Sequence, residues 1–152
     1  MNELRPRELK MTVLATPDMV NFSGNIHGGS VLKLLDQVAY SCAAQYSKEY
    51  CVTLAVERVV FRGPIHVGEL VSFLALVNYV GRTSMEIGIK VIAQAPREDS
   101  VRHVVSCFFT MVAVDENRRP TQIEPFSPST PEEQRRWQAA ELRRQKTGKK
   151  ND

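Results

Sequence analysis

One long apolar helix among alternating strands is the feature that most constrains this fold. Residues 30–47 contain no Gly or Pro, and their apolar side chains gather on one side when placed at about 100° per residue. Elsewhere, β-branched and aromatic residues recur with a period of about 2, which is typical of strands. The runs that predict strands are residues 8–15, 51–62, 71–79, 85–91 and 101–115.

The connections between the later runs are short, which favours hairpins. Residues 63–68, 81–84 and 95–100 have lengths that suit antiparallel neighbours. One face of such a sheet can wrap the helix. We therefore expect an α+β fold in which a largely antiparallel sheet covers one long helix.

The composition indicates a single soluble domain. The chain has 152 residues, of which 43% are hydrophobic and 24% charged, and no apolar run reaches the length of about 18 residues that a membrane span needs. The first ten residues lack the apolar core of a signal peptide. We therefore expect no membrane span and a cytoplasmic location.

The C-terminal segment differs from the rest in charge and pattern. The SPSTP tract at residues 127–131 marks a boundary between a domain at residues 1–125 and a charged, partly helical extension at residues 126–152. Thr130, Pro131 and Glu133 predict a capped helix that ends near residue 145, and its few apolar residues predict weak docking or a partner contact. Its basic charge lacks interleaved aromatic residues, so we expect no nucleic acid partner.

Cysteines and histidines do not form a recognisable site. The three cysteines are far apart in apolar contexts, which predicts buried reduced thiols: Cys42, Cys51 and Cys107. The three histidines are too scattered to bind a metal, so we expect none. No GxSxG motif surrounds Ser30, and His27 is too close in sequence to serve easily as its base.

The start of the long helix carries the candidate chemistry. Gly28 and Gly29 would leave helix N-terminal N–H groups open to an oxygen, where a developing oxyanion is stabilised. Asp36 lies almost two turns further, at the boundary of the apolar face, where partial desolvation would suit a general base or a nucleophile. The side-chain amide of Asn21 or Asn25 could orient water or a carbonyl.

The arrangement as a whole resembles a known family. Asn21-x-x-Gly24-x-x-His27-Gly28-Gly29, followed by segments at residues 56–71, 81–91 and 108–120, resembles the hotdog-fold acyl-CoA thioesterases. It looks most like the cytosolic acyl-CoA hydrolase branch with its small bacterial single-domain members. The likeness covers residues 9–125 in the family's order.

This resemblance implies a hotdog fold, in which an antiparallel sheet wraps one long central helix. It also implies a homo-oligomer, a dimer of hotdogs assembled as a trimer of dimers, or hexamer. The family's site lies at the dimer interface and takes an asparagine and an acidic residue from opposite subunits. On this chain those positions are Asn21 and Asp36, with Gly28 and Gly29 at the helix start, and neither metal nor organic cofactor is required.

The substrate that the resemblance implies is acyl-CoA, whose coenzyme A part carries phosphates. A guanidinium, two hydroxyls and turn N–H groups at Arg82, Thr83 and Ser84 make a suitable phosphate cradle. The family binds the nucleotide end of coenzyme A with this loop and with residues near Arg62.

We therefore expect an enzyme, an acyl-CoA thioester hydrolase that converts fatty acyl-CoA to free fatty acid and coenzyme A. One alternative is a non-catalytic acyl-CoA binding or sensing protein on the same fold. A second alternative is a hotdog dehydratase, which would use a catalytic histidine on or before the helix, such as His27.

Overall fold

The structure is a computed structural model that describes residues 5–146. Its elements in chain order are β1 (Glu8–Leu14), the 3-10 helix η1 (Pro17–Met19), α1 (Gly28–Ser47), β2 (Tyr50–Phe61), β3 (Leu70–Val80), β4 (Ser84–Gln94), β5 (Arg102–Val114) and α2 (Pro131–Lys146). The predicted helices and strands are thus confirmed, with ends displaced by a few residues. Residues 1–4 and 147–152, which include the end of the predicted extension, lie outside the described part of the chain.

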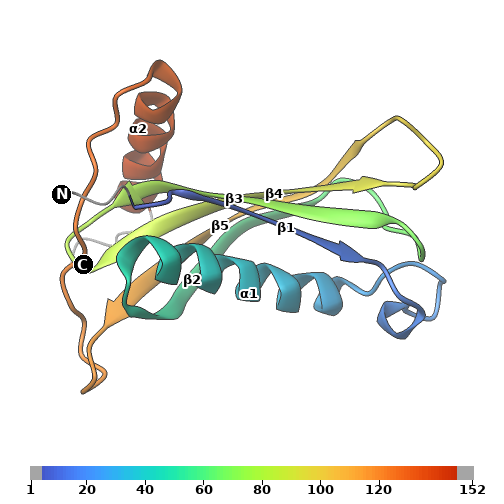
Figure 1. The fold of residues 1–152 in the computed structure, drawn as a ribbon, viewed down its shortest axis with the longest axis horizontal. Helices are drawn as coiled ribbons and strands as arrows, with labels where there is room; N and C mark the ends of the chain where they lie inside the picture. The colour runs from blue at the N-terminus through green and yellow to red at the C-terminus, as the bar shows by residue number, and fades with distance from the viewer. Residues whose placement is uncertain (1–4, 147–152) are drawn as a thin grey trace.

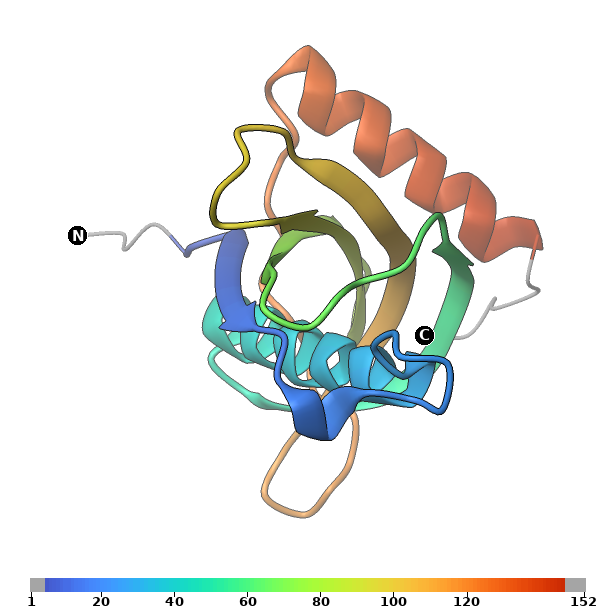
Figure 2. The ribbon, with the colours of Figure 1, turned by 90° about the vertical axis from the view of Figure 1, so that its right-hand side faces the viewer.

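The five strands form one antiparallel sheet in the order β1-β3-β4-β5-β2. Figure 1 and Figure 2 show that the sheet curls around α1, while α2 lies against the opposite, outer face. The expected antiparallel sheet around one long helix is therefore confirmed. Of the helices in the described part of the chain, none is long and apolar enough to cross a membrane.

The inner side of α1 supplies the core. Its buried apolar residues recur every three or four positions: Val31, Leu35, Val38, Ala39, Cys42, Ala43 and Tyr46. They belong to one apolar cluster with fully buried sheet residues such as Phe73, Ile87 and Met111. All three cysteine thiols are free and buried, as predicted. Burial raises the pKa of Cys42 and of Cys107 to about 12, so these thiols stay protonated and unreactive.

The two edges of the sheet differ in chemistry. On β1 the exposed positions include the polar residues Glu8, Lys10 and Thr12. On β2 six large apolar side chains are between 41% and 64% exposed: Tyr50, Val52, Leu54, Val56, Val60 and Phe61. An unpaired edge strand with such a surface is prone to pair with another chain. The β2 edge therefore has the character of an interface.

Arginines as well as apolar contacts hold α2 on the outer face. Ala140 is fully buried, and the ring of Trp137 lies 4.6 Å from the ring of Tyr79. Arg143 donates to both carboxylate oxygens of the buried Glu86, at 2.9 and 2.6 Å. The helix thus makes more contacts than its few apolar residues predict, because the apolar pattern did not count arginines that bind the sheet.

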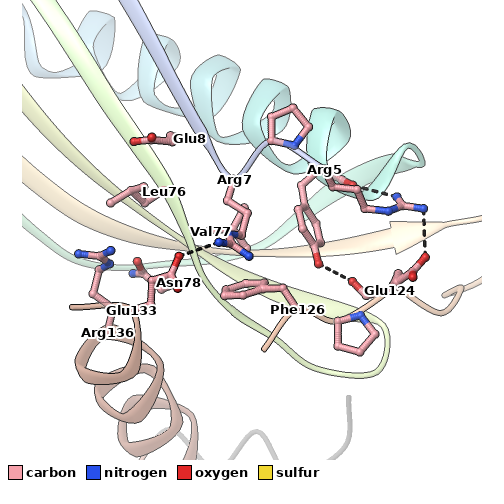
Figure 3. Close-up of a pocket in the computed structure, with 13 residues that line it drawn as sticks. Arg5, Arg7, Glu8, Leu76, Val77, Asn78, Glu124, Phe126, Glu133 and Arg136 are labelled. Atoms are coloured by element: carbon pink, nitrogen blue, oxygen red, sulfur yellow. Dashed lines mark hydrogen bonds and ion pairs between the residues drawn. The ribbon is translucent and has the colours of Figure 1, made fainter. Parts of the chain in front are cut away.

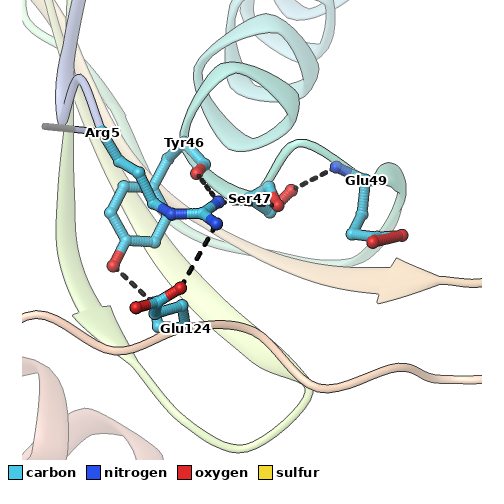
Figure 4. Close-up of polar contacts among 5 residues, drawn as sticks. All are labelled: Arg5, Tyr46, Ser47, Glu49 and Glu124. Carbon is cyan, nitrogen blue, oxygen red and sulfur yellow. Dashed lines mark hydrogen bonds and ion pairs between the residues drawn. The ribbon is translucent and has the colours of Figure 1, made fainter. Parts of the chain in front are cut away.

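A pocket of about 600 Å³ is lined by the segment before β1, by β3, by residues 124–126 and by the first turns of α2 (Figure 3). Arg7 pairs with Glu133 at 2.7 Å across it. Arg5 pairs with Glu124 at 3.3 Å and donates to the carbonyl of Tyr46 at 3.0 Å (Figure 4). These arginines fix the segment that leads to α2, so the contacts around the pocket have a structural role. No predicted site residue lines this pocket.

Candidate active site

Asp36 is held by a threonine on the edge strand. The hydroxyl of Thr53, on β2, donates to Oδ1 of Asp36 at 2.7 Å. Because β2 runs back along α1, the inner face of β2 meets this side of the helix near Asp36. One carboxylate oxygen is thus fixed in orientation, and the other remains available to accept a proton.

An open groove of about 700 Å³ surrounds this pair. Its lining combines polar groups with apolar ones: Met11, Asp36, Gln37, Tyr40, Ser41, Cys51, Val52 and Thr53. Asp36 is exposed here, so the expected partial desolvation is absent in the single chain. The reason is that the groove opens beside the sheet edge, where a single subunit provides no cover.

Asn21 shapes the loop that carries it. Its side-chain oxygen accepts from the N–H of Ser23 at 2.9 Å, the hydroxyl of Ser23 at 2.7 Å and the N–H of Asn25 at 3.2 Å. Gly24 adopts a φ of 91°, which glycine tolerates best, and the loop closes with a β-bridge between Val20 and Ile26. The amide nitrogen of Asn21 has no acceptor among residues 5–146, so it can donate to a ligand.

An ion pair between the buried Glu69 and the partly exposed Arg102 supports this loop. Glu69 is 4% exposed and accepts from Arg102 at 2.7 and 3.0 Å. It also accepts from the N–H of His66 at 2.7 Å, which fixes the segment before β3. In that segment the carbonyl of Ile65 accepts from the N–H of Ile26 at 2.9 Å, at the end of the Asn21 loop.

We expect Glu69→Gln to lower stability by about 1–2 kcal/mol at neutral pH, because it weakens charged hydrogen bonds that partly exposed Arg102 makes. The hydrogen bonds from Arg102 hold the pKa of Glu69 below its ordinary value of 4.5. Its contribution is therefore complete above that value and is lost as pH falls through the lower, folded pKa. Thermal unfolding of both proteins between pH 7 and pH 3 should show the difference narrowing in acid.

Glu116→Gln is the matched control, since Glu116 is an exposed carboxylate in the turn after β5. Its unfolding temperature should follow that of the unchanged protein at every pH. A difference between Glu69→Gln and the unchanged protein that persists undiminished at pH 3 would contradict the assignment.

The start of α1 offers one open backbone donor rather than two. The N–H of Gly29 donates to Nδ1 of His27, the N-cap residue, at 2.9 Å. The N–H of Gly28 has no acceptor among the described residues. The predicted pair of oxyanion donors is therefore reduced to Gly28 in this conformation, and the Nδ1 atom of His27 is engaged with the backbone. In the described part of the chain no hydrogen bond joins the imidazole to the hydroxyl of Ser30.

Gly28 and Arg62 lie together. A second groove, of about 300 Å³, has the following lining: Asn25, Ile26, Gly28, Val31, Phe61, Arg62, Gly63, Pro64 and Ile65. This groove is at the Phe61 end of β2, whereas the Asp36 groove is at the opposite end. Asp36 is eight residues beyond Gly28, or about 12 Å along the helix. A single chain thus has two separate grooves that contain predicted site residues.

The turn at Arg82, Thr83 and Ser84 lies at the Asp36 end of the sheet. Ser84 pairs with Val112 on β5, which pairs in turn with Val52 on β2, so the turn is two strands away, or about 10 Å across. Thr83 and Ser84 are 5% and 1% exposed, and Arg144 donates to the hydroxyl of Ser84 at 3.1 Å. Arg82 is exposed, which makes it the most accessible of the three.

The structure thus unites Asp36 with Thr53 and Gly28 with Arg62, but it leaves Asn21 without a contact to Asp36. Thr53 was not predicted. The only sequence feature that could have indicated Thr53 is that it is a polar residue in an apolar strand. It lies two positions after the buried Cys51, so it is on the same side of the strand. Among residues 5–146 no group of three His, Cys, Asp or Glu side chains could hold a metal ion.

The sequence is similar to those of known proteins. The family model of the thioesterase superfamily matches residues 23–100. The chain is 46% identical to protein VdlD of Helicobacter pylori over 138 residues, 91% of this chain and 79% of that protein. It is 36% identical to an uncharacterised acyl-CoA thioester hydrolase of Zymomonas mobilis over 120 residues, 79% and 80% of the two chains.

Solved structures give the same result. The crystal structure of an apo-hexameric acyl-CoA thioesterase superposes with a TM-score of 0.89 at 31% identity, covering 93% of this chain and 91% of that one. The predicted hotdog fold and class of enzyme, an acyl-CoA thioester hydrolase, are thereby confirmed. The chain belongs to the thioesterase superfamily.

Proposed function

We propose that this protein hydrolyses fatty acyl-CoA to free fatty acid and coenzyme A, in the cytoplasm, at a site shared by two subunits. The observation that carries the proposal is the division into two half-sites at opposite ends of β2. Asp36 and Thr53 lie at one end, and Gly28, Arg62 and the Asn21 loop belong to the other.

Antiparallel pairing of two β2 strands would join these halves. A two-fold axis near the middle of β2 sets the Phe61 end of one strand beside the Thr53 end of its partner. Asn21 and Gly28 of one subunit then face Asp36 of the other. The exposed apolar row on β2 supports this pairing, because it would be buried in the same step.

The chemistry follows from the atoms left available. Asp36 takes a proton from water while the water oxygen adds to the thioester carbonyl carbon, or the carboxylate attacks that carbon itself. The N–H of Gly28 stabilises the oxyanion, and the amide nitrogen of Asn21 orients the water or the carbonyl. On the water route, collapse of the oxyanion breaks the carbon–sulfur bond, and the thiolate of coenzyme A takes up the proton that Asp36 removed from water. On the covalent route, the thiolate leaves first and an anhydride of Asp36 remains; water then hydrolyses this anhydride to the free acid and the carboxylate, and its proton goes to the thiolate.

A larger assembly is part of the proposal. The similar solved thioesterase is described as hexameric, which supports a homo-oligomer built from three such dimers. Arg82, Thr83, Ser84 and Arg62 would then bind the phosphates of coenzyme A, and of these the two arginines are exposed.

The direct test is thiol release from a panel of acyl-CoAs, from acetyl to palmitoyl, followed with a chromogenic disulfide. Turnover of the longer fatty acyl-CoAs supports the proposal and gives the chain-length preference. Tight binding by calorimetry without turnover would move the protein to the binding and sensing class. Hydration of a crotonyl-type substrate without hydrolysis would favour a dehydratase.

Arg82→Ala should raise KM for acyl-CoA about tenfold and change kcat less than threefold, because a charge-assisted contact to a phosphate contributes equally to substrate and transition state. Initial rates across substrate concentrations separate the two constants. Arg97→Ala is the matched control, since Arg97 is exposed in the next hairpin connection, and it should leave both constants unchanged. A fall in kcat with constant KM would contradict a binding role for Arg82.

A further inference from the structure

We propose that His27 is a positioning residue that caps α1 without charge, so that the helix terminus keeps its full positive potential for the oxyanion. This inference rests on the proposed function. It assigns a task to a side chain for which the proposed mechanism has no other use.

The contact is specific. Nδ1 of His27 accepts from the N–H of Gly29 at 2.9 Å, so this nitrogen carries no proton and the ring is uncharged in this conformation. A Cβ placed on Gly29 would lie 3.1 Å from Nδ1 and 3.3 Å from Cε1 of the imidazole. The ring thus lies close to the backbone of Gly29, where a larger residue would fit tightly.

The cap orders the helix start while leaving one donor open. The carbonyl of His27 accepts from the N–H groups of Ser30 at 3.0 Å and Val31 at 3.3 Å. With Gly29 held by the imidazole, every N–H of the first turn has an acceptor except that of Gly28. The remaining donor points at no other described group and borders the groove that Phe61 and Arg62 line.

Charge decides between possible caps. Asp and Asn are both strong N-caps, and Asp has the additional advantage of its attraction to the helix dipole. For stability alone an aspartate would therefore serve at least as well as histidine. Beside an oxyanion, however, a carboxylate one residue away opposes the negative charge that develops in the transition state. A neutral cap avoids that cost.

His27→Asn and His27→Asp test this directly, because the two side chains have nearly the same shape and differ in charge. We expect His27→Asn to keep kcat within threefold of the unchanged enzyme. His27→Asp should unfold at the same or a higher temperature than His27→Asn, yet have a kcat at least tenfold lower with KM changed less than threefold. A merely structural cap would not separate stability from kcat in this way.

Equal kcat values for the two variants would overturn the inference, as would a tenfold loss in His27→Asn. If His27→Asp does not fold, the same comparison of charge can be made at Ser30, in the first turn of α1. Equal kcat values for Ser30→Asp and Ser30→Asn would then overturn the inference. Lack of thiol release by the unchanged protein would instead refute the proposed function, so the two failures are distinguishable.

Discussion

Asp36→Ala should lower kcat for fatty acyl-CoA by about 10²–10⁴, the usual contribution of a positioned general base. Asp36 is exposed and makes one hydrogen bond, from Thr53, so its loss should leave the fold unaffected. The unfolding temperature should stay within about 2 °C of the unchanged protein, since surface substitutions usually cost little. Steady-state thiol release and thermal unfolding measure the two effects.

Gln37→Ala is the matched control for this prediction. Gln37 is the next residue on α1 and lines the same groove, but it has no role in the proposed reaction. Its kcat should stay within threefold of the unchanged enzyme. If Asp36→Ala retained more than a tenth of the original kcat, another group would have to activate the nucleophile.

The second large effect concerns the outer face of the sheet. Arg143→Ala should lower the free energy of unfolding by about 3 kcal/mol, because it leaves the buried carboxylate of Glu86 without its charged partner. Glu86 is 4% exposed, and its remaining donor is Nδ2 of Asn78 at 3.0 Å. The substitution also removes the guanidinium that lies 3.7 Å from the ring centre of Phe108. Chemical denaturation gives the free energy.

The control for Arg143 lies on the same helix. Arg135 pairs with Glu132, but both side chains are about two-thirds exposed, at 67% and 66%. Arg135→Ala should therefore cost less than about 0.5 kcal/mol. If Arg143→Ala lowers the free energy of unfolding by less than about 1 kcal/mol, α2 is docked weakly, as its few apolar residues predicted. Breaking a buried ion pair would cost more than that.

Most of the fold could be predicted because periodicity reports directly on burial. The apolar residues of α1 and the alternation in β3 and β4 identify these elements without any knowledge of their neighbours. The docking of α2 could not be predicted in this way, because Arg143 and Arg144 look like solvated charges until Glu86 and Ser84 are known to face them.

The candidate site was predictable to a smaller extent. The Gly-Gly pair and Asp36 follow from helix geometry, and Asn21 came from the family resemblance. The contact of Thr53 with Asp36 depends on how β2 lies against α1. The two residues are seventeen positions apart in the sequence, and such a contact produces no periodic pattern. The hydrogen bond from the Gly29 N–H to His27 depends on the rotamer of the histidine, and sequence patterns contain no information about rotamers. The boundary between a domain at residues 1–125 and an extension at residues 126–152 stays a prediction.

The shared site is the central claim, and mixing two inactive variants tests it most directly. Asn21→Ala and Asp36→Ala would be co-expressed with different tags, and assemblies that carry both tags would be assayed for thiol release. In hexamers with random pairing, about half of the dimers are mixed and each mixed dimer rebuilds one of its two sites, so about a quarter of the original activity should return. If the assemblies are dimers, all those that carry both tags are mixed, and about half of the activity should return. Activity no greater than that of the separate variants would show that Asn21 and Asp36 do not act across subunits, and would contradict the account.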